Sequence, residues 1–312
     1  MVCRLVALLF CAVWCGVGCT ERDDRPSPEG PIRVVATTGI VADLIRSTGA
    51  DGVEVVALMG PGVDPHLYKP VLTDLERLNR AEVVFYNGAH LEGKMTEVLE
   101  QLGRRTRVVD LAGSLDPARL RNAADSPGYY DPHLWLDIAL WSELIPVVVS
   151  TLSSLRPDWA GAFAARGEAY REELLHLDRW VREQVASIPE AQRVLVTAHD
   201  AFGYFGQAYG LEVVALQGLS TATEFGLFDI QRVVETVTTR QVRAIFVENS
   251  VPERFLSAVQ GGVRARGGEV RLGGELFSDA LGDAGTPAGT YIGMIRANVQ
   301  TIVAALGGTV TP

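Results

Sequence analysis

The chain has 312 residues, of which 47% are hydrophobic and 21% are charged, and it contains 32 glycines. This length and composition predict a folded α/β protein with two modest domains, and they exclude a disordered or fibrous chain. The formal net charge of -10 argues against a nucleic-acid partner and is compatible with attracting cations.

The first nineteen residues predict a secretory signal. One positive charge, Arg4, precedes an apolar stretch at 5–17 that is shorter than the ~20 residues needed to cross a bilayer. The stretch leads into Gly-Val-Gly-Cys, which resembles a bacterial lipoprotein cleavage box with Cys19 as the acylated residue, although glycine stands where leucine is usual. An ordinary signal and an uncleaved anchor are the alternatives. We expect a lipoprotein-type signal at 1–19 and, because charge and proline cannot form a core, a tether at 20–31.

From residue 32 onward, short β-rich runs alternate with longer amphipathic stretches, which is typical of parallel sheets covered by helices. Each half of the chain has four candidate strands: 32–36, 53–58, 82–86 and 107–111 in the first, and 193–196, 211–216, 244–247 and 269–272 in the second. The strand sequence Glu-Val-Val-Ala-Leu occurs once in each half, which mildly favours a duplicated lobe. The sequence therefore predicts an α/β fold of two lobes, each a four-stranded, mostly parallel sheet.

A long helix is predicted between the two halves, at 157–189. Apolar residues recur there at helical spacing: Phe163, Tyr170, Leu174, Leu177 and Val181. Thirty residues of helix would span ~45 Å, and prolines suit both its first turn and its end. We expect this helix to join an N-terminal lobe at 32–156 to a C-terminal lobe at 190–312. A final helix is expected to pack on the second lobe through one apolar face: Ile292, Ile295, Val299, Ile302 and Leu306.

Four polar side chains in turn-rich settings form a candidate metal site: His66, His133, His199 and Asp279. Three imidazoles and one carboxylate suit a divalent transition metal, and no thiolate competes because all four cysteines lie within residues 1–19. Most of them follow predicted strands, and ligands of parallel sheets bind beyond the carboxyl ends of the strands. With two ligands from each half, the metal would bridge the lobes.

Each of these residues also has a structural interpretation. A single histidine beside apolar residues is usually a core residue, Asp-Pro commonly begins a turn, and Asp279 could cap the next segment. The repetition of Asp-Pro-His-Leu in one chain favours the metal site. The two other histidines, His90 and His176, have no similar partner motif and are left out.

Glu248, at the end of a predicted strand, is either an acceptor that orients a histidine ring or an ordinary strand-end carboxylate. It also defines the main rival function, a metal-dependent hydrolase with Glu248 as general base. Catalytic zinc usually has three protein ligands and keeps a position open for water. Four protein ligands disfavour that rival.

Five ordered motifs together resemble the zinc/manganese solute-binding proteins of bacterial ABC importers (cluster A-I), and most nearly the treponemal-type subgroup, TroA. They are Gly-Pro-Gly-Val-Asp-Pro-His-Leu-Tyr at 60–68, Tyr-Asn-Gly-Ala-His-Leu-Glu at 86–92, Asp-Pro-His-Leu-Trp-Leu-Asp at 131–137, Thr-Ala-His-Asp-Ala-Phe-Gly-Tyr-Phe at 197–205 and Gly-Gly-Glu-Leu-Phe-Ser-Asp-Ala at 273–280. The resemblance extends from residue 32 to residue 306.

The resemblance implies a binding protein that performs no catalysis. Its two lobes, joined by one long helix, would capture zinc, manganese or iron and hand it to a permease with its ATPase in the inner membrane. It implies the same four metal ligands: His66, His133, His199 and Asp279. We expect a monomer in the periplasm or at the cell surface, anchored through Cys19. The resemblance also suggests a role as a surface adhesin, which these residues neither support nor exclude.

Two features of the sequence bear on which metal the site prefers. Zinc-dedicated members usually carry a histidine-rich loop between the first two ligand motifs, whereas the region at 112–130 is short and lacks histidine. Manganese-dedicated members tend to have glutamate where this chain has His199. The chain thus falls between them, and its nitrogen-rich site favours zinc chemically. We expect affinity to fall as the pH drops through ~6.5 and the lobes to close only slightly.

Overall fold

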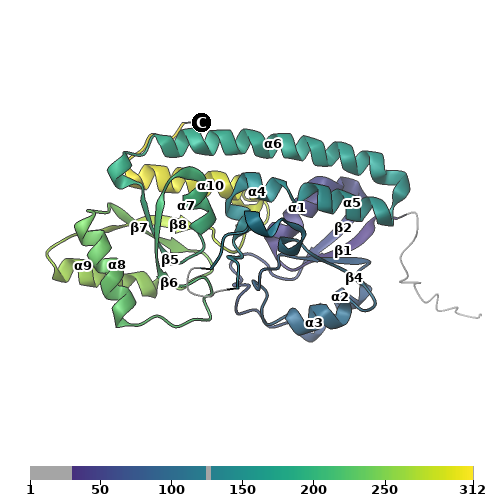
Figure 1. Ribbon diagram of the computed structural model, residues 1–312, viewed down its shortest axis with the longest axis horizontal. Coiled ribbons are helices and arrows are strands. Elements are labelled where there is room, and N and C mark those ends of the chain that lie inside the picture. Colours follow the sequence, from purple (N-terminus) through teal and green to yellow (C-terminus); the bar gives the residue numbers. More distant parts are fainter. Residues whose placement is uncertain (1–29, 124–127, 312) are drawn as a thin grey trace, which may run out of the picture.

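The computed structural model describes residues 30–123 and 128–311. It contains two α/β lobes side by side, with one long helix lying across both of them (Figure 1). The predicted signal at 1–19 and nearly all of the predicted tether lie outside the described residues.

The two four-stranded sheets confirm the predicted, mostly parallel lobes; they have the same topology, and all of their strand pairs are parallel. The N-terminal sheet has the order β2-β1-β3-β4 and the C-terminal sheet the order β6-β5-β7-β8. The first contains β1 (Ile32–Ala36), β2 (Val53–Ala57), β3 (Val83–Tyr86) and β4 (Arg107–Asp110), and the second contains β5 (Val194–His199), β6 (Glu212–Gln217), β7 (Ala244–Glu248) and β8 (Arg271–Leu276). The repeated Glu-Val-Val-Ala occupies the equivalent edge strands β2 and β6.

Strand β5 is longer than predicted. The sequence prediction ended it at residue 196, where the apolar run stops, and placed His199 beyond it. The strand instead includes His199, which pairs with Gln217 on β6. On the other side, the Glu248 carboxylate accepts the backbone N–H groups of Ala198 and His199 at 2.8 and 2.9 Å. A side chain at the end of β7 thus takes the place of backbone pairing, a pattern that apolar periodicity does not reveal.

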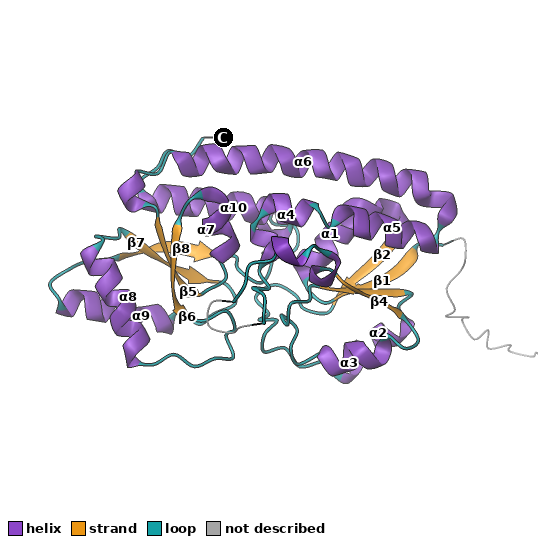
Figure 2. Ribbon diagram, in the orientation of Figure 1, coloured by secondary structure: helices purple, strands orange, loops and turns teal. Residues whose placement is uncertain are grey.

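Helices cover both sheets, and Figure 2 shows them gathered between the sheets and α6 and on the opposite face. The N-terminal lobe has α1 (Gly39–Gly49), α2 (Leu72–Arg80), α3 (Thr96–Leu102), α4 (Ile138–Ser142) and α5 (Ile145–Leu155); the C-terminal lobe has α7 (Gly203–Tyr209), α8 (Leu227–Thr239), α9 (Arg254–Ala265) and α10 (Tyr291–Leu306). The apolar helical stretch Ile138–Leu155 is long enough to cross a membrane by length and composition. It packs against α6 and α1, which is the behaviour of a core element.

The connecting helix α6 (Ala160–Ala186) follows a short 3₁₀ turn at Pro157–Trp159. Its 27 residues span ~40 Å at 1.5 Å per residue. All five residues of the predicted apolar seam are buried. Gly167 lies in the same seam, and a Cβ there would come within 2.7 Å of Val149 on α5. Glycine therefore permits close packing of α6 on α5.

Helix α10 packs on the C-terminal lobe and also forms hydrogen bonds to the N-terminal lobe. The Tyr291 backbone N–H donates to Asp43 on α1 at 3.0 Å, and its hydroxyl donates to the Trp135 carbonyl at 2.7 Å. Trp135 in turn donates through Nε1 to the Ser278 carbonyl of the C-terminal lobe at 2.8 Å. One apolar core runs beneath α6 through both lobes and includes Phe85 of β3 and Phe246 of β7. The lobes are therefore braced at several points besides α6.

Candidate metal centre

Four buried side chains, two from each lobe, converge between the sheets. His66 comes from the segment between β2 and α2, His133 from the turn before α4, His199 from the end of β5, and Asp279 from the segment after β8. One ligand atom from each of them lies within 4.8 Å of all the others. This is the set that the sequence predicted, gathered at the carboxyl ends of the strands.

The imidazole Nε2 atoms surround the Asp279 carboxylate. The distances from Nε2 to the nearer carboxylate oxygen are 3.3 Å for His199, 3.5 Å for His133 and 3.7 Å for His66. The Nε2 atoms of His66 and His133 lie 3.3 Å apart. Asp279 Oδ1 and His199 Nε2 are buried and have no hydrogen-bond partner among the described residues. Buried polar atoms normally have one, so this donor set fits a cation at its centre.

The repeated Asp-Pro-His sequence has a local physical reason. Asp64 Oδ1 accepts the backbone N–H of His66 at 2.8 Å, and Asp131 Oδ1 accepts that of His133 at 3.0 Å. An aspartate that binds the backbone two residues ahead closes an Asx turn, and proline fixes the intervening φ. Each turn presents its histidine in a fixed direction.

Two further carboxylates hold the far nitrogen of a histidine ring. Asp131 Oδ1 lies 2.7 Å from Nδ1 of His133, and Glu248 Oε2 lies 2.6 Å from Nδ1 of His199. With Nδ1 occupied in this way, both rings direct Nε2 into the cluster. Carboxylates behind ligating histidines orient the ring and increase its basicity. Of the two interpretations of Glu248, the geometry favours the ring-orienting one.

Electrostatics differs among the cluster residues. Burial lowers the pKa of His66 to about 3. Burial also acts to lower the pKa of His199, but the Glu248 and Asp279 carboxylates outweigh it and raise that pKa well above the ordinary value. For Asp279, burial is opposed by His199 and the other imidazoles, which hold its pKa below the usual range. Asp279 is therefore ionised and His66 neutral, whereas His199 holds a proton that a metal must displace.

A cavity of about 360 Å³ reaches the cluster from outside and is lined by His66 together with His90, Asp200 and the segment Gly218–Ser220. The segment belongs to the loop after β6. His66 is also the most exposed of the four clustered residues, at 6%. Because His66 lines this cavity, the cavity is the candidate approach to the cluster.

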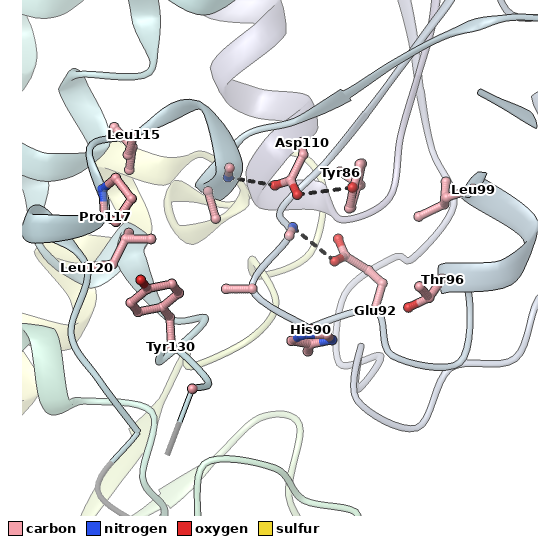
Figure 3. A pocket seen from close by; sticks show the side chains of 15 residues that line it. Tyr86, His90, Glu92, Thr96, Leu99, Asp110, Leu115, Pro117, Leu120 and Tyr130 are labelled. Carbon is pink, nitrogen blue, oxygen red and sulfur yellow. Dashed lines mark hydrogen bonds between the residues drawn. The ribbon is translucent and has the colours of Figure 1, made fainter. Parts of the chain in front are cut away.

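The two histidines that the prediction left out do not belong to the cluster of four, although His90 lines the approach cavity together with His66. His176 is exposed on α6 and contacts Arg179. His90 lies beside a second cavity of about 330 Å³ in the N-terminal lobe (Figure 3). The carboxylates there are occupied: Asp110 accepts from the Tyr86 hydroxyl at 3.1 Å, and Glu92 accepts from backbone N–H groups. His90 contacts Tyr129, with ring centroids 4.8 Å apart and ring planes tilted by 52°.

Sequence reasoning missed three residues that support the cluster. Asp64 and Asp131 were read only as turn residues, although an aspartate two positions before each candidate histidine was a usable signal. Arg121 gave no such signal. Its guanidinium pairs with Asp131 at 2.6 Å, and its backbone N–H donates to the Tyr204 hydroxyl of the other lobe at 2.8 Å.

Comparison with known proteins agrees with this geometry. Residues 34–305 match the family model described as the periplasmic component A of the zinc-uptake complex, ZnuA. The chain belongs to the ZnuA family.

Relatives within the ZnuA family match over nearly their whole length. The chain is 43% identical to the manganese-binding lipoprotein MntA of Bacillus subtilis over 302 residues, covering 97% of this chain and 98% of that one. It is 46% identical to the zinc-binding protein TroA of Treponema pallidum over 278 residues, covering 89% and 90%. The solved structure of the periplasmic zinc-binding protein TroA superimposes with a TM-score of 0.86 at 45% identity, covering 89% of this chain and 99% of that one. The solved structure of Fe(III)-bound YtgA from Chlamydia trachomatis gives 0.81 at 28% identity, covering 90% and 100%.

Proposed function

We propose that this chain is the extracytoplasmic metal-binding protein of an ABC importer. It captures a divalent transition metal between its lobes and delivers it to a permease and its ATPase. The ligands are His66, His133, His199 and Asp279. One observation carries the proposal: four buried side chains from two lobes offer ligand atoms within 4.8 Å of one another. The family and the names of the relatives support the same function.

The donor set accommodates more than one metal. Three imidazoles and one carboxylate suit zinc, and such a site binds zinc more tightly than manganese. Relatives are named for manganese, zinc and iron. Zinc and manganese are the proposed cargo, with iron as a third candidate, and the supply and the permease decide which is delivered.

The position of Glu248 argues against the rival hydrolase. Both of its oxygens are engaged behind His199: Oε1 accepts two backbone N–H groups, and Oε2 lies 2.6 Å from Nδ1. The metal side of that ring is Nε2, which faces Asp279. A general base must reach the water that it activates, and Glu248 is on the wrong side of the ring.

We further propose that the protein is a monomer held at the membrane by an acylated Cys19, with a signal at 1–19 and a tether at 20–31. The two lobes would be 32–156 and 190–312, joined by 157–189. Relatives named as lipoproteins support the anchor. Metabolic labelling with a radioactive fatty acid, compared between the native chain and Cys19→Ala, tests it.

The decisive experiment measures the metal retained after purification from a medium with equal zinc, manganese and iron. The protein should hold one equivalent of metal by mass spectrometry. His199→Ala should abolish tight retention, whereas His176→Ala, which changes an exposed histidine on α6, should leave it unchanged. Equal retention by His199→Ala and the native protein would refute the site, and hydrolytic turnover with metal-bound water would favour the rival.

A further inference from the structure

One hydrogen bond crosses between the lobes next to the metal centre. The Thr221 hydroxyl of the C-terminal lobe donates to Asp64 Oδ2 of the N-terminal lobe at 2.6 Å. The other oxygen of the same carboxylate, Oδ1, accepts the backbone N–H of His66 at 2.8 Å. Asp64 therefore ties a candidate metal ligand of one lobe directly to a loop of the other lobe.

The loop that carries Thr221 is itself tied to the second half of the metal centre. It leaves β6 at Gln217, which pairs with His199 in the sheet and whose side-chain amide donates to the Thr221 carbonyl at 2.8 Å. The backbone N–H of Asp200 donates to the Gly218 carbonyl at 3.3 Å. The start of this loop is thus held beside His199, and Thr221 extends from it toward Asp64.

The same loop forms a wall of the approach to the metal. Gly218, Leu219, Ser220 and Thr223 line the cavity that reaches His66. His66 is the ligand exposed to that cavity. Any ion that leaves by this route must pass between His66 and the loop, and the Asp64–Thr221 bond joins these two walls.

We propose that the Asp64–Thr221 hydrogen bond is a latch that slows metal release. The proposal rests on the function proposed above, with metal bound by His66 and its three partners. At 2.6 Å, the contact between the Thr221 hydroxyl and the Asp64 carboxylate is at the short end of the range for hydroxyl-to-oxygen hydrogen bonds. While it holds, His66 stays in its Asx turn and the loop stays against it. When it breaks, the wall of the cavity can move away and His66 can leave the ion. Asp64 and Thr221 are positioning residues in this step and do not touch the metal.

The test uses the zinc-loaded full chain and excess chromogenic chelator in a stopped-flow instrument, so that the rate constant of zinc dissociation is measured. Thr221→Val keeps the shape of the side chain and removes the donor. It should raise the dissociation rate about tenfold, which corresponds to ~1.4 kcal/mol. Thr221→Ser restores a hydroxyl and should return the rate to within about twofold of the native value. Thr239→Val makes the same change at an exposed position of the same lobe, on α8 and away from the cavity, and should leave the rate unchanged.

A double-mutant cycle distinguishes the latch from general loosening of the loop. In an Asp64→Ala background, Thr221→Val should have no further effect on the dissociation rate, because its partner is already absent. The unfolding midpoint of the metal-free protein should be similar for Thr221→Val and Thr239→Val. A native rate in Thr221→Val, an equal rise in Thr239→Val or a full further rise in the Asp64→Ala background would each overturn the latch. If the native chain retains no zinc, the metal-binding function itself fails, which is a separate result.

Discussion

Replacing Glu248 by glutamine tests how far a carboxylate behind a ligand controls metal affinity. The substitution keeps the shape of the side chain and a carbonyl oxygen that can accept the N–H groups of Ala198 and His199, now bound at 2.8 and 2.9 Å. It removes the negative charge that lies 2.6 Å from Nδ1 of His199. The end of β5 should therefore remain in place while the electrostatic support of the ring is lost.

The expected loss of affinity follows from this geometry. Glu248 and His199 are both fully or nearly fully buried, so water does not screen the contact. Losing such a ring-orienting carboxylate typically costs 10- to 100-fold in metal affinity, or about 1.4 to 2.8 kcal/mol. Of the two carboxylates that raise the pKa of His199, Glu248 has the larger effect. In the variant, His199 should therefore lose its proton at lower pH, and zinc should displace fewer protons at neutral pH.

Two measurements check these expectations. Competition with a chelator of known affinity gives the zinc dissociation constant, and calorimetry in buffers of different ionisation enthalpy gives the number of protons released. Glu212→Gln is the matched control, because Glu212 forms an exposed pair with Arg240 on the surface of the same lobe. A dissociation constant within twofold of the native one, with unchanged proton release, would refute the role assigned to Glu248.

Three other predictions follow from the same structure. The pKa of His199 is raised above its ordinary value, and only the neutral imidazole can bind a metal. Zinc affinity should therefore rise about tenfold per pH unit up to that raised pKa and then level off. Equal affinities at pH 6 and pH 7 would contradict this. Leu174→Ala in the buried seam of α6 should cost about 2–5 kcal/mol of unfolding free energy, measured by urea denaturation, whereas Glu172→Ala on the exposed face should cost little. Metal-free and metal-loaded protein should give nearly the same radius of gyration in solution scattering, and a large difference would exclude the small closure predicted here.

Most of the fold could be predicted because apolar periodicity reports burial. The strands of parallel sheets, covered on both faces, appear as short apolar runs, and the seam of α6 repeats at helical spacing. The prediction was wrong where a strand continues into polar residues: Thr197 and His199 belong to β5, although the apolar run ends before them. Nothing local in the sequence shows that Glu248 from β7 completes their hydrogen bonds.

Of the candidate metal centre, the sequence predicted the four clustered residues but not the contacts that support them. The residues that converge carry their own signal, since imidazole and carboxylate are the side chains a transition metal selects and Asp-Pro-His occurs twice. The contacts that support these residues have no such signal in the sequence. Thr221 meets Asp64 across 157 positions of the chain, and a single threonine in a loop has no pattern that indicates its partner. Long-range hydrogen bonds of this kind are set by the assembly of the two lobes.

The contacts between the lobes indicate which of the four proposed ligands can move. Trp135, two residues after His133, donates to the carbonyl of Ser278, next to Asp279, and its own carbonyl accepts the Tyr291 hydroxyl. The segments that carry His133 and Asp279 are thus joined across the lobes by buried hydrogen bonds. His199 is fixed within β5. His66 comes from the irregular segment between β2 and α2 and faces the approach cavity. Release through His66 would leave both lobes and α6 in place, whereas a wide hinge motion would have to break the core that the lobes share.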